Sequence, residues 1–252
     1  SFTDAKGVLN QTRYTQPCMV AFAAGMTALL AERGIVPAAA AGLSLGEYSA
    51  LHAAGVFDAD TAVELVAFRG KAMEEAAAGR PSAMVAVLGL DRAALQEACD
   101  EASAHGCVVI ANYNCPGQLV ISGSNEAVDA ACAKLTEAGA KRALKLNVGG
   151  AFHSPLMEPA RVELEAAIQA APFTKPVCPV YQNVDAKPHT DPAEIKANLI
   201  AQLTAPVRWT QIAQNMIADG AASFTELGPG TVLQGLIKKV NREAQATSKQ
   251  SL

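Results

Sequence analysis

The chain has 252 residues, of which 50% are hydrophobic and 17% are charged, and its formal net charge is −4 at pH 7. This length predicts one large α/β domain or a domain with an insert, with ample apolar residues for a core. A net negative charge gives no electrostatic basis for binding nucleic acid, so we expect no nucleic-acid partner. The longest apolar stretch, at about 18–31, is interrupted and too short to span a bilayer, so we expect no membrane partner.

The cysteines are scattered along the chain and form no Cys-x-x-Cys pair or Cys/His cluster. This pattern predicts no metal site, and it predicts reduced thiols in a cytoplasmic protein. The six cysteines are Cys18, Cys99, Cys107, Cys115, Cys132 and Cys178.

The first predicted elements surround a Gly-x-Ser-x-Gly motif at 42–46, centred on Ser44. An amphipathic helix is expected over about 16–32. A small apolar run at 35–41 then leads into the motif, and an alanine-rich helical run at 45–54 follows it. This strand–turn–helix order is the context that a nucleophile elbow requires. An ordinary glycine-rich strand-to-helix turn is the alternative interpretation.

The elbow interpretation assigns a task to each small residue of the motif. Gly42 and Gly46 would lack Cβ atoms where strand and helix nearly touch, so that Ser44 sits strained at the apex. Its hydroxyl would then lie over the start of the following helix, where unpaired N–H groups favour a developing oxyanion. The backbone N–H of Leu45 is the predicted oxyanion donor.

Arg69 lies on the apolar face of the next predicted helix, which Asp58 caps and which runs to Ala78. A permanently charged guanidinium buried there requires an anion. The sequence leaves open a structural salt bridge, a side chain that reaches out to water, or a grip on a substrate carboxylate by two hydrogen bonds.

Between about 81 and 146 the pattern becomes β-α-β-β-α-β, the order of a ferredoxin-like unit. Strands are expected at about 83–88, 107–113, 118–122 and 142–146, with helices capped by Asp91 and Ser124. We therefore predict a small subdomain at 81–146 inserted in a large α/β core made of 1–80 and 147–252.

His153 precedes a further helix, for which Ser154 fits the N-cap and Pro155 the first position. A lone histidine on a loop is more often structural than catalytic, so its role depends on the motif around it. The remaining expected elements are strands at 179–183 and 223–226, helices at 191–203, 209–218 and 231–240, and a frayed polar end at 241–252.

Several motifs, in order and over nearly the whole chain, resemble the malonyl-CoA:acyl carrier protein transacylases of fatty-acid synthesis. The resemblance implies an α/β-hydrolase-like core with a parallel sheet. The motifs are Tyr-Thr-Gln-Pro at 14–17, Gly-Leu-Ser-Leu-Gly-Glu-Tyr at 42–48, Phe-Arg-Gly-Lys-Ala-Met at 68–73, Asn-Tyr-Asn-Cys-Pro-Gly-Gln at 112–118, Gly-Ala-Phe-His-Ser-Pro-Leu-Met at 150–157 and Pro-Val-Arg-Trp at 206–209.

By this resemblance Ser44 is the acyl-accepting nucleophile and His153 is its general base. Arg69 would hold the malonyl carboxylate. Gln202 would orient His153 through its backbone carbonyl, which replaces the carboxylate of a Ser-His-Asp triad.

The resemblance also implies a set of substrate-binding residues beside Arg69, namely Gln16, Asn112 and Phe152. The aromatic ring of Phe152 should crowd out a methyl branch on the acyl chain. The implied cofactor set is empty, because the substrates are a coenzyme A thioester and the phosphopantetheine of the partner protein.

Two features depart from the family pattern. Leu43 stands where family members usually carry histidine. The family also opens with a strand and a Gly-Gln-Gly-Ser-Gln motif, whose first glutamine helps to form the oxyanion hole, and Ser1 of this chain lies past that point. We therefore expect one oxyanion donor fewer and an exposed edge in the central sheet.

The predicted function is transfer of a malonyl group from malonyl-CoA to acyl carrier protein through a malonyl-serine intermediate. A serine hydrolase with the same elbow and an inactive truncated acyltransferase fragment are the alternatives. Acyl carrier proteins are acidic, so a basic docking patch is expected, with Lys141, Arg142, Lys145, Lys238 and Lys239 as candidates.

Overall fold

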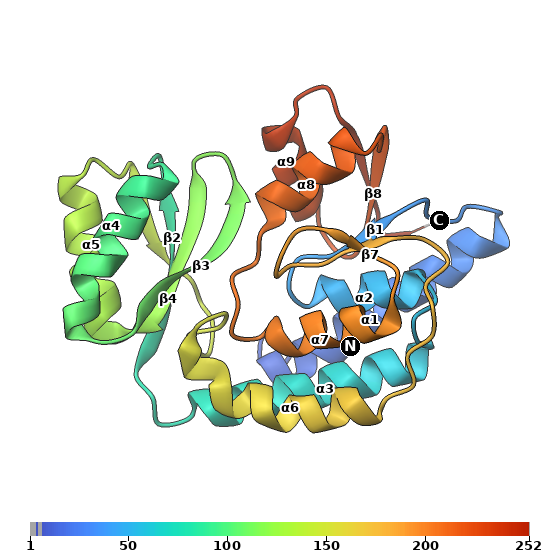
Figure 1. The fold of residues 1–252 in the computed structure, drawn as a ribbon, viewed down its shortest axis with the longest axis horizontal. Helices are drawn as coiled ribbons and strands as arrows, with labels where there is room; N and C mark the ends of the chain where they lie inside the picture. The colour runs from blue at the N-terminus through green and yellow to red at the C-terminus, as the bar shows by residue number, and fades with distance from the viewer. Residues whose placement is uncertain (1–3, 5–6, 252) are drawn as a thin grey trace.

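The structure, a computed structural model, describes residue 4 and residues 7–251 (Figure 1). Its α-helices are α1 (Thr12–Glu32), α2 (Gly46–Ala53), α3 (Ala59–Ala77), α4 (Arg92–Ala102), α5 (Asn125–Glu137), α6 (Glu158–Ala170), α7 (Pro192–Ala201), α8 (Trp209–Ala218) and α9 (Val232–Val240). Its strands are β1 (Ala40–Ala41), β2 (Ser82–Leu88), β3 (Val108–Cys115), β4 (Gln118–Ser124), β5 (Arg142–Lys145), β6 (Val180–Tyr181), β7 (Pro188–His189), β8 (Ser223–Leu227) and β9 (Gln245–Lys249). Two 3₁₀ turns, η1 (Ser103–His105) and η2 (Pro155–Met157), precede Gly106 and α6.

Residues 82–145 form a four-stranded sheet of order β3-β4-β2-β5, whose strand pairs are antiparallel. Helices α4 and α5 cover one face of this sheet (Figure 1). Val85 and Val87 of β2 pack under these helices, whereas Met84 and Ala86 belong to a cluster on the opposite side, against which Phe152 packs. Because both faces of β2 are covered, its sequence is a continuous apolar run instead of an alternation.

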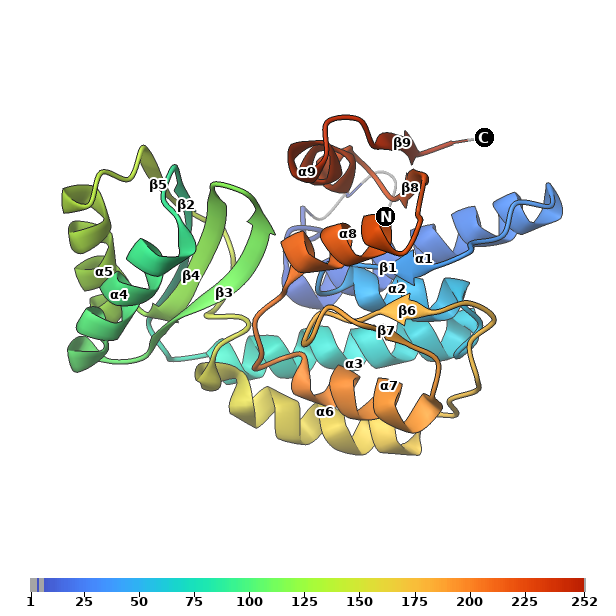
Figure 2. The ribbon, with the colours of Figure 1, turned by 45° about the horizontal axis from the view of Figure 1, so that its top comes forward.

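The rest of the chain is built around short strands and long helices. β1 pairs in parallel with β6, β7 extends that sheet antiparallel, and β8 pairs in parallel with β9. Helix α3 packs against α1 and against α6, and Figure 2 shows α3 and α6 below β6 and β7. Their core includes Leu51, Val66, Leu164 and Leu199, all nearly inaccessible to solvent.

The segment 241–251 contains a strand, contrary to the sequence-based expectation that 241–252 is frayed. Gln245–Lys249 forms β9, and Ala246 is 5% exposed beneath α9. The expectation failed because the segment is polar by composition, while its pairing partner is a strand some twenty residues earlier in the chain. Leu252 lies outside the described residues.

Helix α1 begins four residues before the predicted start at about 16, and it contains Pro17. Among the described helices it is the one whose length and composition would permit a membrane crossing, which corrects the expectation that the apolar stretch is too short. That finding alone is weak evidence, and α1 packs along α3, where Arg13 and Glu74 form an ion pair of 2.6 Å.

Backbone hydrogen bonds join the small sheet to the rest of the molecule. Val207 N–H donates to the Ala111 carbonyl at 2.8 Å, and Tyr113 N–H donates to the Val207 carbonyl at 2.9 Å. The chain returns from β5 through Gly150, whose added Cβ would lie 2.6 Å from Ala77 Cβ. A glycine at 150 therefore permits the loop carrying His153 to pass close to α3.

Candidate active site

Ser44 sits at the apex of a sharp turn between β1 and α2, with φ of +52°. A left-handed conformation is uncommon for a residue with a side chain. A Cβ added to Gly42 would lie 1.9 Å from the Gly46 carbonyl carbon, so only glycine fits at 42. The parallel prediction for Gly46 was wrong. A Cβ there would meet nothing within 4 Å, because the close contact involves the backbone of Gly46 and the missing side chain of Gly42.

His153 lies against Ser44, 109 residues away in sequence, with Ser44 Oγ 2.7 Å from His153 Nε2. The other ring nitrogen, Nδ1, lies 3.1 Å from the Gln202 carbonyl and 3.2 Å from the Ala205 carbonyl. Carbonyl oxygens only accept, so Nδ1 carries the proton and Nε2 is free to accept the Ser44 hydroxyl proton. Ser154 Oγ accepts from Leu156 N–H at 3.3 Å and caps the turn that follows.

Burial, followed by the positive charge of Arg69, lowers the pKa of His153 to about 4. The imidazole is therefore neutral at pH 7 and able to act as a base.

Arg69 is 1% exposed, and its hydrogen bonds all go to neutral acceptors. Nη1 donates to Gln16 Oε1 at 2.8 Å, and Nη2 donates to Ser44 Oγ at 3.0 Å and to Gln202 Oε1 at 3.3 Å. Within the described part of the chain Arg69 has no carboxylate partner, and its Nε has no hydrogen-bond acceptor. Burial lowers the pKa of the guanidinium, although arginine stays charged in proteins.

These contacts exclude two of the three readings of Arg69 that the sequence left open. The side chain does not reach water, and no salt bridge within residues 4 and 7–251 neutralises it. A buried cation beside a reactive hydroxyl, held only by neutral groups, is a site prepared for an anion.

Gln202, just after α7, makes more contacts than the sequence suggested. Its backbone carbonyl accepts from His153, as the resemblance implied. Its side chain also acts, because Nε2 donates to the Ser44 carbonyl at 3.0 Å while Oε1 accepts from Arg69. One residue thus contacts His153, Ser44 and Arg69.

The backbone N–H of Leu45 has no hydrogen-bond acceptor among the described residues, whereas Ser44 N–H donates to Asn183 Oδ1 at 2.6 Å. Leu45 immediately precedes α2, where N–H groups lack intrahelical partners. Leu45 N–H is therefore the free donor beside the nucleophile.

The remaining predicted residues lie at different distances from this centre. Gln16 joins it directly through Arg69, and its Nε2 lies 3.3 Å from Met73 Sδ. Phe152, next to His153, is half-buried between the core and the small sheet. Asn112 is 7% exposed on β3, and no hydrogen bond links its side chain to the described catalytic groups.

The sequence did not single out Glu47, Gln182 or Asn183, which form a buried polar network behind the elbow. Glu47 belongs to the elbow motif, which is the one signal that marks it. Its partners lie more than 130 residues later, so no local pattern could reveal them.

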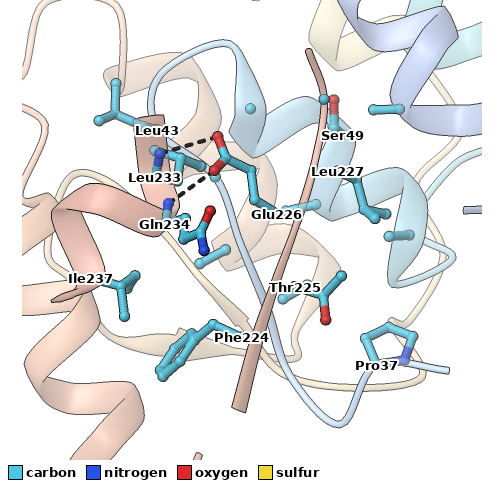
Figure 3. A pocket seen from close by; sticks show the side chains of 18 of the residues that line it. Pro37, Leu43, Ser49, Phe224, Thr225, Glu226, Leu227, Leu233, Gln234 and Ile237 are labelled. Carbon is cyan, nitrogen blue, oxygen red and sulfur yellow. Dashed lines mark hydrogen bonds between the residues drawn. The ribbon is translucent and has the colours of Figure 1, made fainter. Parts of the chain in front are cut away.

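A separate cavity of about 430 Å³ lies behind the elbow, between β1 and β8 (Figure 3). Apolar groups dominate its wall, and Ser44, His153 and Arg69 do not line it. On its rim, Glu226 accepts from Leu233 N–H at 3.0 Å and Gln234 N–H at 2.9 Å, as the dashed lines of Figure 3 show.

The acyl transferase domain family model matches residues 3–252, which places the chain among acyl transferases. The malonyl CoA-acyl carrier protein transacylase of Bacillus subtilis (strain 168) is 44% identical over 235 residues, which are 93% of this chain and 74% of the relative. That of Escherichia coli (strain K12) is 44% identical over 233 residues, covering 92% and 75% of the two chains.

Solved structures agree with these relatives. An acyl carrier protein S-malonyltransferase from Vibrio cholerae matches with a TM-score of 0.95 at 41% identity, over 99% of this chain and 81% of that one. A malonyl-transacylase in complex with a type II PKS acyl-carrier protein matches with a TM-score of 0.95 at 39% identity, over 98% and 80%. This chain therefore belongs to the malonyl CoA-acyl carrier protein transacylase family.

Proposed function

We propose that this chain transfers a malonyl group from malonyl-CoA to the phosphopantetheine thiol of acyl carrier protein, in fatty-acid synthesis, through a malonyl ester on Ser44. The observation that carries the proposal is the buried Arg69 guanidinium. It donates to Ser44 Oγ at 3.0 Å and has no carboxylate partner in the described structure. An acyl group with a free carboxylate supplies the missing anion, and a general esterase has no need of such a cation.

In the first half-reaction the Ser44 hydroxyl attacks the thioester carbonyl carbon, and its proton passes to His153 Nε2, 2.7 Å away. The negative charge that develops on the carbonyl oxygen is stabilised by the free N–H of Leu45. The tetrahedral intermediate then collapses with cleavage of the carbon–sulfur bond. His153 returns the proton to the sulfur, and coenzyme A leaves as a thiol.

The substrate carboxylate also adjusts the base. It displaces neutral acceptors from Arg69 and cancels a positive charge that lowers the pKa of His153. The imidazole of the substrate complex is therefore a stronger base than that of the free protein, which couples proton abstraction to the presence of an acidic acyl group.

In the second half-reaction the phosphopantetheine thiol gives its proton to His153 and attacks the ester carbonyl. The second tetrahedral intermediate collapses with cleavage of the bond to Ser44 Oγ, which recovers the proton from His153. This ping-pong sequence is balanced with side chains alone, so we propose that it uses no metal or redox cofactor.

As to architecture, we propose an α/β-hydrolase-like core formed by 1–80 and 147–252, with a ferredoxin-like subdomain at 81–146. The parallel pairs β1–β6 and β8–β9, with an elbow leading from β1 into α2, support the core assignment. The element order β2-α4-β3-β4-α5-β5 and the strand order β3-β4-β2-β5 support the subdomain.

Phe152, at the junction of the two proposed parts, is placed to limit the width of the acyl group. Asn112 and Gln16 complete the proposed substrate-binding set, Gln16 through its bond to Arg69. We propose a cytoplasmic location, which the free cysteines support, since none of the six is in a disulfide.

The test is intact-mass analysis of the protein after incubation with malonyl-CoA. We expect one malonyl adduct, mapped to Ser44 by peptide analysis and absent from Ser44→Ala. A folded protein that never acquires the adduct would support the alternative that these 252 residues are catalytically inactive.

A further inference from the structure

Glu47 is a fully buried carboxylate that the reaction scheme does not use. It lies in the first turn of α2, directly behind the nucleophile, and is 0% exposed. One carboxylate oxygen accepts from the backbone N–H of Asn183 at 2.7 Å, and the other accepts from Gln182 Nε2 at 3.1 Å. The carboxylate therefore fixes the segment that follows β6 against the start of α2.

The side chain of Asn183 holds the first half of the strained turn, from Gly42 to Ser44. Its Oδ1 accepts from Ser44 N–H at 2.6 Å, and its Nδ2 donates to the Gly42 carbonyl at 2.7 Å. These two bonds flank Leu43, and the first fixes the N–H of Ser44, the residue with φ of +52°. Asn183 thus satisfies the two backbone groups that a left-handed turn leaves without a partner in the elbow.

The hydrogen bonds of Asn183 to Gly42 and Ser44 have two consequences for the proposed reaction. They hold the turn so that Ser44 Oγ stays 2.7 Å from His153 Nε2. They also occupy Ser44 N–H, so the oxyanion must be met by the next N–H, that of Leu45.

Resting on the proposed function, we propose that Glu47 is a positioning residue for the nucleophile. It holds Asn183, and Asn183 in turn fixes the elbow that presents Ser44 to His153. Glu47 makes no hydrogen bond to Ser44 or His153, and its hydrogen-bonded route to the nucleophile passes through Asn183.

The chain offers a matched control in Glu226. Its carboxylate also accepts two N–H groups, those of Leu233 and Gln234, but at the start of α9, and it makes no hydrogen bond to the elbow in the described structure. Glu226→Gln therefore reports the cost of weakening a carboxylate that anchors backbone N–H groups, without removing a hydrogen bond to Asn183 or the elbow.

The first measurement is the rate at which phenylmethylsulfonyl fluoride, a serine-directed reagent without a carboxylate, sulfonylates Ser44. The variants are Glu47→Gln, Asn183→Ala and Glu226→Gln. We expect losses on the order of 10–100-fold for the first two, because small displacements of reacting groups cost rates of this size, and no loss for the control. In malonyl transfer, kcat should fall by a similar factor while KM for malonyl-CoA stays within about twofold.

A double variant separates positioning from general destabilisation. If Glu47 acts through Asn183, the combination of Glu47→Gln with Asn183→Ala should label no more slowly than Asn183→Ala alone. Losses that multiply would overturn the proposal, as would wild-type labelling in folded Glu47→Gln and Asn183→Ala.

Folding is monitored by circular dichroism. If Asn183→Ala fails to fold, Asn183→Asp replaces it, because aspartate keeps the acceptor for Ser44 N–H and loses the donor to the Gly42 carbonyl. We then expect an intermediate labelling rate, and an unchanged rate would overturn the proposal. Because labelling needs neither malonyl-CoA nor carrier protein, a wild-type protein that labels but does not transfer malonyl would contradict the proposed function alone.

Discussion

Arg69 is the buried residue on which the proposed substrate specificity depends. A guanidinium that is 1% exposed and donates only to neutral oxygens loses hydration without gaining a hydrogen-bonded carboxylate in the described structure. The sequence could place it on an apolar helix face, since helical periodicity is local. Periodicity could not distinguish an ion pair from an unpaired cation, because that difference depends on what other segments bring to the same place.

The Arg69 assignment predicts selective loss of activity. Arg69→Ala should lower kcat/KM for malonyl-CoA by roughly 10²–10³-fold, since truncating one partner of a buried charge pair costs about 2–5 kcal/mol. Transfer from acetyl-CoA, which lacks the carboxylate, should be affected much less. Steady-state kinetics with the two thioesters measures the difference, and equal losses would contradict a carboxylate-binding role.

The buried acid and base give opposite pH dependences of stability. Because the pKa of His153 is lowered from 6.5 to about 4, the unfolded chain binds more protons in that window, and this term makes stability rise with pH. Because burial raises the pKa of Glu47 from 4.5 to about 7, the folded chain binds more protons there, and this term makes stability fall with pH.

Replacing Glu47 with glutamine should reveal the pH dependence of stability that is due to His153. In Glu47→Gln, the free energy of unfolding should rise more steeply with pH than in the wild type between 4.5 and 6.5, the window where the two shifts overlap. The difference in slope is at most about 1.4 kcal/mol per pH unit for one titrating group. Urea unfolding across this window provides the measurement, and parallel profiles for the two proteins would contradict the assignment.

At the scale of elements, the elbow depends on one glycine more than on the other. A Cβ at Gly42 would overlap the backbone of Gly46, whereas a Cβ at Gly46 would meet no atom within 4 Å. The Gly-x-Ser-x-Gly pattern shows two equivalent glycines, and only the coordinates show which of them makes the close contact.

The two alanine variants form a matched pair. Gly42→Ala should destabilise the fold by about 3 kcal/mol or more and abolish acylation of Ser44, because the clash is with backbone that cannot move aside. Gly46→Ala, in a helical first turn, should leave both properties nearly unchanged. Thermal unfolding and labelling of Ser44 test the pair, and similar behaviour of the two variants would show that this account of the turn is wrong.

Elements defined by local pattern were predicted well, and those defined by distant partners were not. The helix at 209–218 was predicted with the observed bounds, because its apolar period and its start are local. Within the predicted strand at 35–41, only Ala40–Ala41 forms a strand. Its pairing partner, β6, is two residues long. Ser124 occupies the predicted N-cap position of α5, but its hydroxyl bonds to the Cys107 carbonyl and not to the helix.

At the scale of the whole molecule, the family motifs alone assign Ser44, His153 and Arg69 to one site. The network of Glu47 with Gln182 and Asn183 could not be anticipated, because it forms only when the segment after β6 packs against α2. The sequence therefore predicted which three residues meet at the site, but not the residues that hold them there.

The edge of the small sheet is our preferred docking surface for acyl carrier protein. All four residues of β5 are exposed, and Leu144 is 48% exposed between basic side chains. Charge reversal by Arg142→Glu and Lys145→Glu should raise KM for the carrier protein several-fold, mainly at low salt, with KM for malonyl-CoA unchanged.

The other basic candidates supply the control for this surface. Lys238→Glu with Lys239→Glu places the same charge change on α9, and it should leave KM for the carrier protein near the wild-type value. A larger rise in KM for the carrier protein from the α9 variant than from the β5 variant would indicate that the docking surface is on α9.

The most direct test of the account is the fate of the acyl group on Ser44. The protein is acylated with radiolabelled malonyl-CoA, freed of excess substrate, and divided between buffer alone and buffer with the phosphopantetheine form of acyl carrier protein. We predict that the ester persists in buffer and that the label moves to the carrier thiol at a rate that depends on His153. Loss of malonate to water at the same rate in both samples would contradict the account and identify a hydrolase.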